Sequence, residues 1–295
     1  MSDDIVCPAQ KARPCRVLDG ARCSAVPPEP EPEPACAVFE RGQLVASRYR
    51  VEWRLGSSGG AQMYRVFDKE LHEAVALKAA RGTSPSAPVV RTLFAEARQT
   101  RLIRHPNICR VHDVGVHQSP GAGSERVYFS TLELIDGWRL ARVVSEGALE
   151  LPSALAIARQ VLAGLEAAHR AGVQHRRLDS RRVLISGPTA DPRVRIVEFG
   201  LAELNELTSS EERQAGLALD LHGFGLVLLE MLTGRQPVAG QPARPHGGGS
   251  SPVWLPRVLP TRIPPHIAEV VRRCTSPKPG EGFEHIRAVR SALSS

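Results

Sequence analysis

A glycine-rich turn and a lysine beyond it are the first residues in the chain whose types and spacing could do chemistry. The turn lies within Leu55-Gly-Ser-Ser-Gly-Gly-Ala-Gln-Met-Tyr64, and Lys78 ends the apolar run Val75-Ala-Leu-Lys78. Small residues let backbone N–H groups approach an anion, and the lysine adds a positive charge. The pattern predicts a phosphate-binding device, and Glu96 in the next helical segment is an acid that can pair with Lys78.

The expected pair of Lys78 and Glu96 has two interpretations that the sequence leaves open. In the first, the pair organises a site that still binds phosphate. In the second, it is a salt bridge that only ties a helix to a sheet.

Alternating segments in the first half of the chain and helical periodicity in the second half must position these residues. Strand patterns cover residues 49–55, 63–67, 73–78, 110–116 and 127–134, and helical patterns cover 89–104, 152–171, 215–233, 265–274 and 283–293. Residues 237–264 are rich in proline and glycine and are expected to form an irregular loop. Strands followed by helices predict an α+β fold with two lobes, the first built on a five-stranded sheet with one long helix.

Residues 1–40 are expected to form a disordered tail without a core. The run Pro27–Pro34 alternates proline and glutamate and predicts a stiff, solvated spacer. Four of the six cysteines lie in the tail, and their wide, uneven spacing favours free reduced thiols over a zinc site: Cys7, Cys15, Cys23 and Cys36. The other two, Cys109 and Cys274, stand in apolar patterns and are expected to be packing residues.

Charge and hydropathy give expectations about partners and location. The net charge is +7, but the arginines are spread along the chain without interleaved aromatic residues, so we expect no nucleic-acid partner. The most apolar stretch, Gly216–Gly234, is broken by Asp220, His222 and Glu230, so we expect no membrane span. The chain starts with the acidic Met1-Ser-Asp-Asp and no apolar segment follows, so we expect a cytoplasmic protein.

Further motifs follow the glycine-rich turn in a fixed order. Seven motifs come after the apolar run that ends in Lys78. In order, they are an acid in a helix, the end of a helix, a short connection, two loop motifs, and the start and the end of one further helix: Phe94–Glu96, His105–Ile108, Leu132–Gly137, His175–Arg182, Val197–Gly200, Asp220–Gly225 and Glu230–Gly234. Together they resemble bacterial-type serine/threonine protein kinases over about residues 48–293. The resemblance implies a bilobal protein-kinase-like fold in residues 41–295, with a small β-rich N-lobe at 41–137 and a larger helical C-lobe at 138–295.

The resemblance also implies a nucleotide-binding set in this chain. It comprises Leu55, Gly56, Gly59, Met63, Ala76, Lys78, Glu96, Glu133, Ile135 and Leu184. The glycine-rich turn itself departs from the family pattern, because Ser58 and Ala61 stand where the family has glycine.

Three departures fall on the catalytic positions of the family. Arg177 occupies the position of the catalytic base, although arginine is always protonated and has no acceptor. Arg182 occupies the position of an asparagine that binds metal, and Glu198 replaces the aspartate that is the principal metal ligand. We therefore expect no intact catalytic residue and no metal site. Asp179, two positions after Arg177, is the acid that could substitute for the base.

The segment after Glu198 is also short. Only residues 201–219 separate Gly200 from Asp220, and no A-P-E motif, which ends the substrate-positioning segment of active kinases, is present there. The arginines of the catalytic-loop position have two interpretations: an anion site, or local pairing with Asp179, Glu198 or Glu203. They are Arg176, Arg177, Arg181 and Arg182.

Two functions of different classes follow. The first is a pseudokinase that acts as a regulatory or scaffolding module on a protein partner, an active kinase or another signalling protein. The second is a divergent active kinase that transfers the γ-phosphate of ATP to protein. In the first case, the resemblance implies ATP binding without a Mg²⁺ requirement, because Arg182 brings a positive charge to the place of one metal ion. Pairing between Glu198 and Arg182 would instead close the site.

Overall fold

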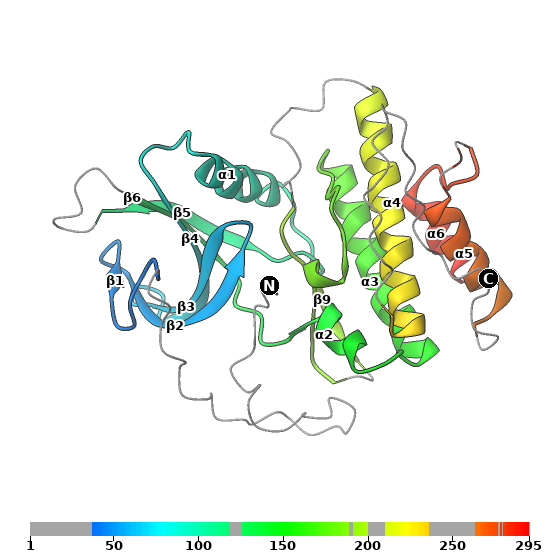
Figure 1. The fold of residues 1–295 in the computed structure, drawn as a ribbon, viewed down its shortest axis with the longest axis horizontal. Helices are drawn as coiled ribbons and strands as arrows, with labels where there is room; N and C mark the ends of the chain where they lie inside the picture. The colour runs from blue at the N-terminus through cyan, green and yellow to red at the C-terminus, as the bar shows by residue number, and fades with distance from the viewer. Residues whose placement is uncertain are drawn as a thin grey trace. The chain divides into compact units, whose positions relative to one another are not determined.

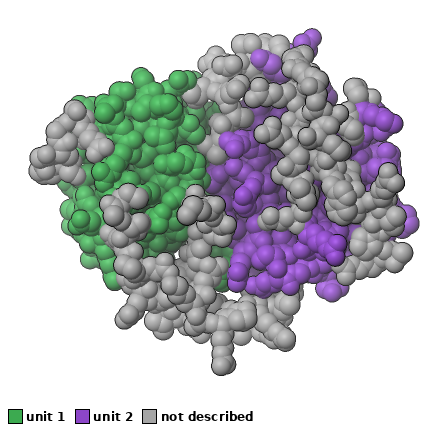
Figure 2. Space-filling view, viewed as in Figure 1, with its two compact units in different colours: residues 1–104, 109–138 green, residues 105–108, 139–295 purple. Residues whose placement is uncertain are grey.

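The computed structural model describes residues 37–118, 126–188, 191–199, 210–235, 263–276, 278 and 280–294. The chain forms two compact units, which Figure 2 colours separately: unit 1 is residues 1–104 and 109–138, and unit 2 is residues 105–108 and 139–295. The tail cysteines, the Pro-Glu spacer and residues 237–262 of the expected irregular loop lie outside the described residues.

Unit 1 is built on one antiparallel sheet (Figure 1) with the strand order β1-β2-β3-β4-β6-β5. The strands are β1 (Leu44–Val45), β2 (Tyr49–Ser58), β3 (Ala61–Asp68), β4 (Glu73–Gly82), β5 (Val111–His117) and β6 (Arg126–Leu132). The sequence predicted five of them. The sixth, β1, has two residues and pairs with the start of β2, and a strand this short has no periodicity to detect.

One face of this sheet is covered by the segment that precedes it. Phe39 and Val45 are buried and pack with Tyr64, Leu77 and other residues of a single apolar cluster. The Tyr64 hydroxyl also accepts a hydrogen bond from the Phe39 backbone N–H at 3.1 Å. The folded core of unit 1 therefore includes residues before position 41, where the sequence analysis placed the start of the domain.

The other face of the sheet carries helix α1 (Pro88–Thr100). Proline at the first helical position fits the helix without losing a hydrogen bond. Val90 and Leu93 are buried against Ala80 of β4 and Tyr128 of β6. Because side chains alternate along a strand, Ala80 and Lys78 lie on the same face of β4. Helix α1 therefore packs on the face that presents Lys78.

Unit 2 is mainly helical (Figure 1). It contains α2 (Leu140–Ser145), α3 (Leu151–Arg170), the short 3₁₀ turn η2 (Ser180–Arg182), the antiparallel pair β8 (Val183–Ser186) and β9 (Arg193–Ile196), and the helices α4 (Ser210–Thr233), α5 (Pro265–Thr275) and α6 (Ile286–Ala292). Strand β7 (Trp138–Arg139) lies next to β8 at the point where unit 1 gives way to unit 2. The expected α+β arrangement, with strands in the first half of the chain and mainly helices in the second, is confirmed.

Helix α4 is the central helix of unit 2 and begins at Ser210, five residues before the predicted start. The extra residues are polar and have no apolar periodicity, but Glu211 and Glu212 stand in the first turn, where negative charge stabilises a helix. By length and composition α4 could also cross a membrane, yet two thirds of its most apolar stretch is buried inside the unit. Burial in the core of unit 2 therefore accounts for the apolar residues of α4.

Two further contacts hold the helices of unit 2 together. Glu166 on α3 accepts hydrogen bonds from Arg287 Nε at 2.8 Å and Arg290 Nη1 at 2.7 Å, both on α6, and these arginines lower the pKa of Glu166.

Cys274 on α5 is buried, and burial raises its pKa to about 12, so the thiol stays protonated. Cys274 and the equally buried Cys109 are free cysteines, which confirms their expected packing role.

Candidate functional site

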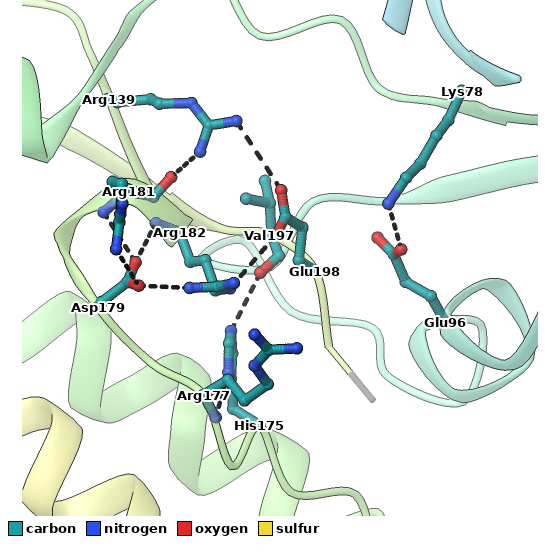
Figure 3. Close-up of polar contacts among 10 residues, drawn as sticks. All are labelled: Lys78, Glu96, Arg139, His175, Arg177, Asp179, Arg181, Arg182, Val197 and Glu198. Atoms are coloured by element: carbon teal, nitrogen blue, oxygen red, sulfur yellow. Dashed lines mark hydrogen bonds and ion pairs between the residues drawn. The ribbon is translucent and has the colours of Figure 1, made fainter. Parts of the chain in front are cut away.

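Lys78 and Glu96 form the ion pair that the sequence predicted. Lys78 lies on β4 and Glu96 on α1, and Lys78 Nζ lies 2.5 Å from Glu96 Oε2 (Figure 3). Both residues are buried, with exposed fractions of 3% and 4%. A buried charge that has lost water needs a partner, so the pair fixes α1 to the sheet whether or not a phosphate is bound.

Strand register places three of the other expected nucleotide residues of unit 1 on the face that presents Lys78. Met63 of β3 is directly opposite Lys78, and Gly56 of β2 is directly opposite Met63. Ala76 lies two residues before Lys78 on β4 and therefore on the same face. Three further members are located in unit 1 by their strands or hydrogen bonds: Leu55 is in β2, Glu133 donates its N–H to Arg110 O at 2.8 Å, and Ile135 follows β6. Leu184 is on β8 of unit 2.

The glycine-rich turn is a tight hairpin. Ser58 pairs with Ala61, so only Gly59 and Gly60 form the turn, with φ angles of 60° and 80°. Positive φ at both central residues is the two-residue hairpin geometry that favours Gly-Gly. Ser58 and Ala61 are therefore strand residues here, and their side chains are buried without requiring a left-handed backbone.

In unit 2, His175 is the buried centre of the loop that leads to η2. Its Nε2 lies 3.0 Å from the Val197 carbonyl oxygen, and its Nδ1 lies 3.3 Å from the Arg177 backbone nitrogen. Because an N–H must donate to Nδ1, the ring carries its proton on Nε2. Burial lowers the pKa of His175, which agrees with a neutral ring. The ring also packs on Phe199, with centroids 4.8 Å apart.

Asp220 of α4 binds the backbone of the same loop. Its carboxylate accepts hydrogen bonds from the backbone N–H groups of His175, at 2.9 Å, and of Arg176, and its Oδ2 lies 2.6 Å from His169 Nε2. Arg176 has a left-handed φ of 61°, a conformation that costs free energy in a non-glycine residue. Asp220 and His175 both hold the loop backbone in place.

Two glycines let α4 approach this loop closely. A Cβ atom on Gly223 would lie 2.6 Å from the Leu178 carbonyl oxygen, and one on Gly216 would lie 1.8 Å from Gln174 Oε1. Gln174 also donates a hydrogen bond to the Arg213 carbonyl oxygen. At Gly223 only glycine permits this approach without displacing the loop backbone, whereas a Cβ at position 216 would displace the end of the Gln174 side chain. Residues 210–219, which follow the short segment after Gly200, are therefore committed to a helix that supports the loop.

Two of the three departing catalytic positions, Arg182 and Glu198, form a compact ionic network with two neighbours (Figure 3). Arg182 Nε lies 3.2 Å from Glu198 Oε2, and Arg182 Nη1 also contacts Asp179. Arg139 Nη2 lies 3.8 Å from Glu198 Oε1 and Nη1 donates a hydrogen bond to the Arg181 carbonyl oxygen. Glu198 therefore faces two guanidinium groups, and its left-handed φ of 64° directs it there.

This network does not fit a magnesium site. Mg²⁺ requires several oxygen ligands in near-octahedral geometry. Glu198 is engaged by two cations, and Arg182 is a second obstacle, because a guanidinium supplies only donors. Among the residues that the structure describes, no group of three His, Cys, Asp or Glu side chains is arranged to hold a metal ion.

Asp179, the acid considered as a substitute base, is engaged in the local structure. Its Oδ1 accepts hydrogen bonds from the backbone N–H groups of Arg181 at 3.0 Å and Arg182 at 3.2 Å, so it caps η2. Its other oxygen pairs with the Arg182 side chain. Local pairing thus accounts for Arg181 and Arg182, as one of the two interpretations predicted; Glu203 lies outside the described residues.

Arg177 behaves differently from its neighbours. Its backbone N–H is fixed on His175, but its side chain is exposed, and no ion pair or hydrogen bond joins its guanidinium to any of the described residues. Figure 3 draws no contact between this guanidinium and the Arg182–Glu198 pair. The position of the catalytic base therefore holds a fixed positive charge that is open to solvent.

Sequence reasoning missed Arg139 and Gln174. Arg139 reaches Glu198 from β7, far away in sequence, and no local pattern could indicate this contact. Gln174 contacts α4 only because the fold brings Gly216 next to it. The cap made by Asp179 did have a signal, because an aspartate often accepts the N–H groups two and three residues ahead.

Comparisons with known proteins agree with this arrangement. Residues 49–247 match the model of the protein kinase domain family. The chain is 29% identical over 256 residues to the serine/threonine-protein kinase PknA of Mycobacterium tuberculosis, covering 78% of this chain and 57% of the relative. It is 25% identical over 270 residues to PrkC of Bacillus subtilis, covering 82% of this chain and 39% of the relative. The chain thus spans about half the length of the curated relatives it matches, or less.

The fold is similar to that of a solved protein kinase domain. The kinase domain of Mycobacterium tuberculosis PknI, in a crystallised variant, superposes with a TM-score of 0.61 at 21% identity, covering 88% of this chain and 98% of that chain. The fold and the order of the site motifs define a protein kinase domain. The chain belongs to the protein kinase domain family, and the relatives to which it is similar are bacterial serine/threonine-protein kinases.

Proposed function

We propose that this serine/threonine protein kinase domain is catalytically impaired and acts as a regulatory or scaffolding binding module. The observation that carries the proposal is the pairing of Glu198 with Arg182 and Arg139 beside the exposed Arg177. A general base contributes about 10²–10⁴ to a rate, and Arg177 cannot accept a proton. Metal ions neutralise the charge that develops in phosphoryl transfer, and Glu198 is engaged by arginines instead.

The alternative is a divergent active kinase, and Lys78 with Glu96 favours it, because this pair is retained in full. An assay with radiolabelled ATP, Mg²⁺ or Mn²⁺, and both the chain itself and a generic protein substrate separates the two functions. We expect no label transfer above the background of Lys78→Met, which lacks the lysine of the pair. Transfer that the wild type shows and Lys78→Met lacks would establish the enzyme and end the pseudokinase proposal.

We also propose that ATP binds without requiring Mg²⁺. Lys78 and Arg182 supply positive charges, and guanidinium groups pair well with phosphate oxygens. Glu198 competes for Arg182, so the binding is expected to be weak.

ATP should then raise the melting temperature equally in EDTA and in Mg²⁺, because a ligand of the folded state stabilises it by mass action. Arg182→Ala should remove the shift, and Arg193→Ala, an exposed arginine on β9, should keep it. A shift seen only with Mg²⁺ would make Glu198 a metal ligand. No shift in either buffer would mean that Glu198 keeps the site closed.

The partner class and location remain proposals of the same kind. We propose a protein partner, an active kinase or another signalling protein, and a cytoplasmic location, without nucleic-acid or membrane partners. The spread of basic residues along the chain and the burial of α4 inside unit 2 support this proposal. Pull-down of the tagged chain with quantitative comparison against Arg177→Gln would identify partners that depend on the catalytic-loop position.

A further inference from the structure

The loop that contains the catalytic position has more positive charge than its own acids can neutralise. Residues 175–182 carry four arginines and one aspartate. Arg139 and Glu198 join this group through the network and add one charge of each sign. Five guanidinium groups thus share two carboxylates, and a net charge of three remains.

The excess charge is not spread evenly. Arg182 and Arg139 contact Glu198, and Arg182 also contacts Asp179. Arg181 lies 3.7 Å from Asp179, but its side chain is 66% exposed. The guanidinium groups of the two remaining arginines meet no carboxylate among the described residues: Arg176 Nε donates to Gln174 Oε1, a neutral acceptor, and Arg177 is exposed without a side-chain contact.

The backbone of Arg177 is held in place, while its exposed side chain makes no contact with the described residues. Its N–H bonds to the buried ring of His175, and the neighbouring Arg176 N–H bonds to the buried Asp220. The loop backbone on both sides of the side chain is therefore ordered before any ligand arrives. Pre-ordering lowers the entropy lost when a ligand is bound.

We propose that this loop binds the phosphate group of a phosphorylated serine or threonine on a protein partner, with Arg177 as the principal contact. A phosphate monoester carries a charge of about −1.5 to −2 at neutral pH and three acceptor oxygens. A guanidinium donates to two such oxygens at once. The internal pairing of Glu198 and Asp179 with Arg182 removes the acids that would otherwise repel the phosphate.

This inference rests on the proposed function and names the partner of the same site. The position of Arg177 is where the family resemblance places the base that faces a protein hydroxyl group. Replacing an acceptor by an exposed cation converts a place for a hydroxyl into a place for a phosphorylated hydroxyl. Because charge rather than peptide shape supplies the contact, we expect recognition of the phosphate with little dependence on the peptide sequence.

Fluorescence anisotropy with a labelled phosphoserine peptide, in EDTA and without nucleotide, tests the proposal. We expect the phosphopeptide to bind at least about tenfold more tightly than its unphosphorylated form, and Arg177→Gln to weaken it about tenfold. Arg177→Lys should lie between, because it keeps the charge but loses the planar fork. Arg193→Gln removes another exposed arginine of unit 2 and should leave the affinity unchanged. Melting temperatures of all variants confirm that they fold.

Three results would overturn the inference. One is an unchanged affinity in Arg177→Gln. Another is an equal loss in Arg193→Gln, which would mean unspecific attraction by the net charge. The third is binding of inorganic phosphate or ATP that Arg177→Gln abolishes while no phosphopeptide competes, which would assign the charge to a free phosphate or nucleotide. The radiolabel assay is independent of all three, so failure here and failure of the pseudokinase proposal are distinguishable.

Discussion

Asp220→Asn is expected to destabilise the folded chain by about 3 kcal/mol or more, the usual loss when one partner of a buried charged network is removed. Asp220 is fully buried, and its two oxygens serve the N–H groups of His175 and Arg176 and the His169 ring. The asparagine NH₂ group would face at least one of these donors, which leaves both groups unsatisfied. The loss corresponds to a fall in melting temperature of about 6–12 °C in a chain of this size.

Thermal and chemical unfolding of the variant measure this loss. The matched control is Asp191→Asn, an exposed aspartate before β9 of the same unit, which should stay within about 0.5 kcal/mol of the wild type. Hydrogen exchange adds a local readout, because the amides of His175 and Arg176 should lose protection first. An Asp220→Asn protein as stable as the control would show that the loop does not depend on this carboxylate.

The fold could be predicted from the sequence wherever one pattern repeats long enough. The alternation in Tyr49–Leu55 and the periodicity of residues 152–171 predicted β2 and α3, because burial of one face imposes period 2 on a strand and period 3.6 on a helix. The two-residue β1 has too few positions for a period. The start of α4 was placed late because residues 210–214 are polar on every side, although Ser209 and Glu212 form a capping-box pattern that could have located it.

The candidate site could be predicted in its members but not in its contacts. The sequence predicted the pair of Lys78 and Glu96, because a lysine that ends an apolar run and an acid in the next helical segment are suited to pair. The acid with which each arginine pairs depends on distances in the folded structure, and the spacing of residues in the sequence does not give these distances. Arg139 reaches Glu198 only because β7 runs next to β8, the strand that begins immediately after Arg182. The pairing of Glu198 with Arg139, on which the proposed function rests, therefore depends on the tertiary structure and not on the local sequence.

Restoring the three family residues at the catalytic positions together is not expected to restore catalysis. The triple variant Arg177→Asp, Arg182→Asn and Glu198→Asp returns the acid, the amide and the aspartate of active kinases to their positions. We nevertheless expect its peptide phosphorylation to stay at least about 10²-fold below a typical kinase rate, because positioning of the reacting groups contributes as much as the groups themselves. An assay with radiolabelled ATP and a panel of serine and threonine peptides measures this rate.

The reason lies in the segment between Gly200 and Asp220. Helix α4 already begins at Ser210, and its Gly216 packs against Gln174. Residues 210–219 are therefore part of a support for the loop, and only residues 201–209 remain before it, without an A-P-E motif. The three substitutions leave this helix unchanged, so they repair the chemistry and not the place of the peptide. They also remove Arg182 and Arg177 together, and phosphopeptide binding in EDTA should fall in the same variant. A triple variant that phosphorylates peptides at an ordinary rate would show that α4 leaves the substrate position free, and that the three side chains alone separate this chain from an active kinase.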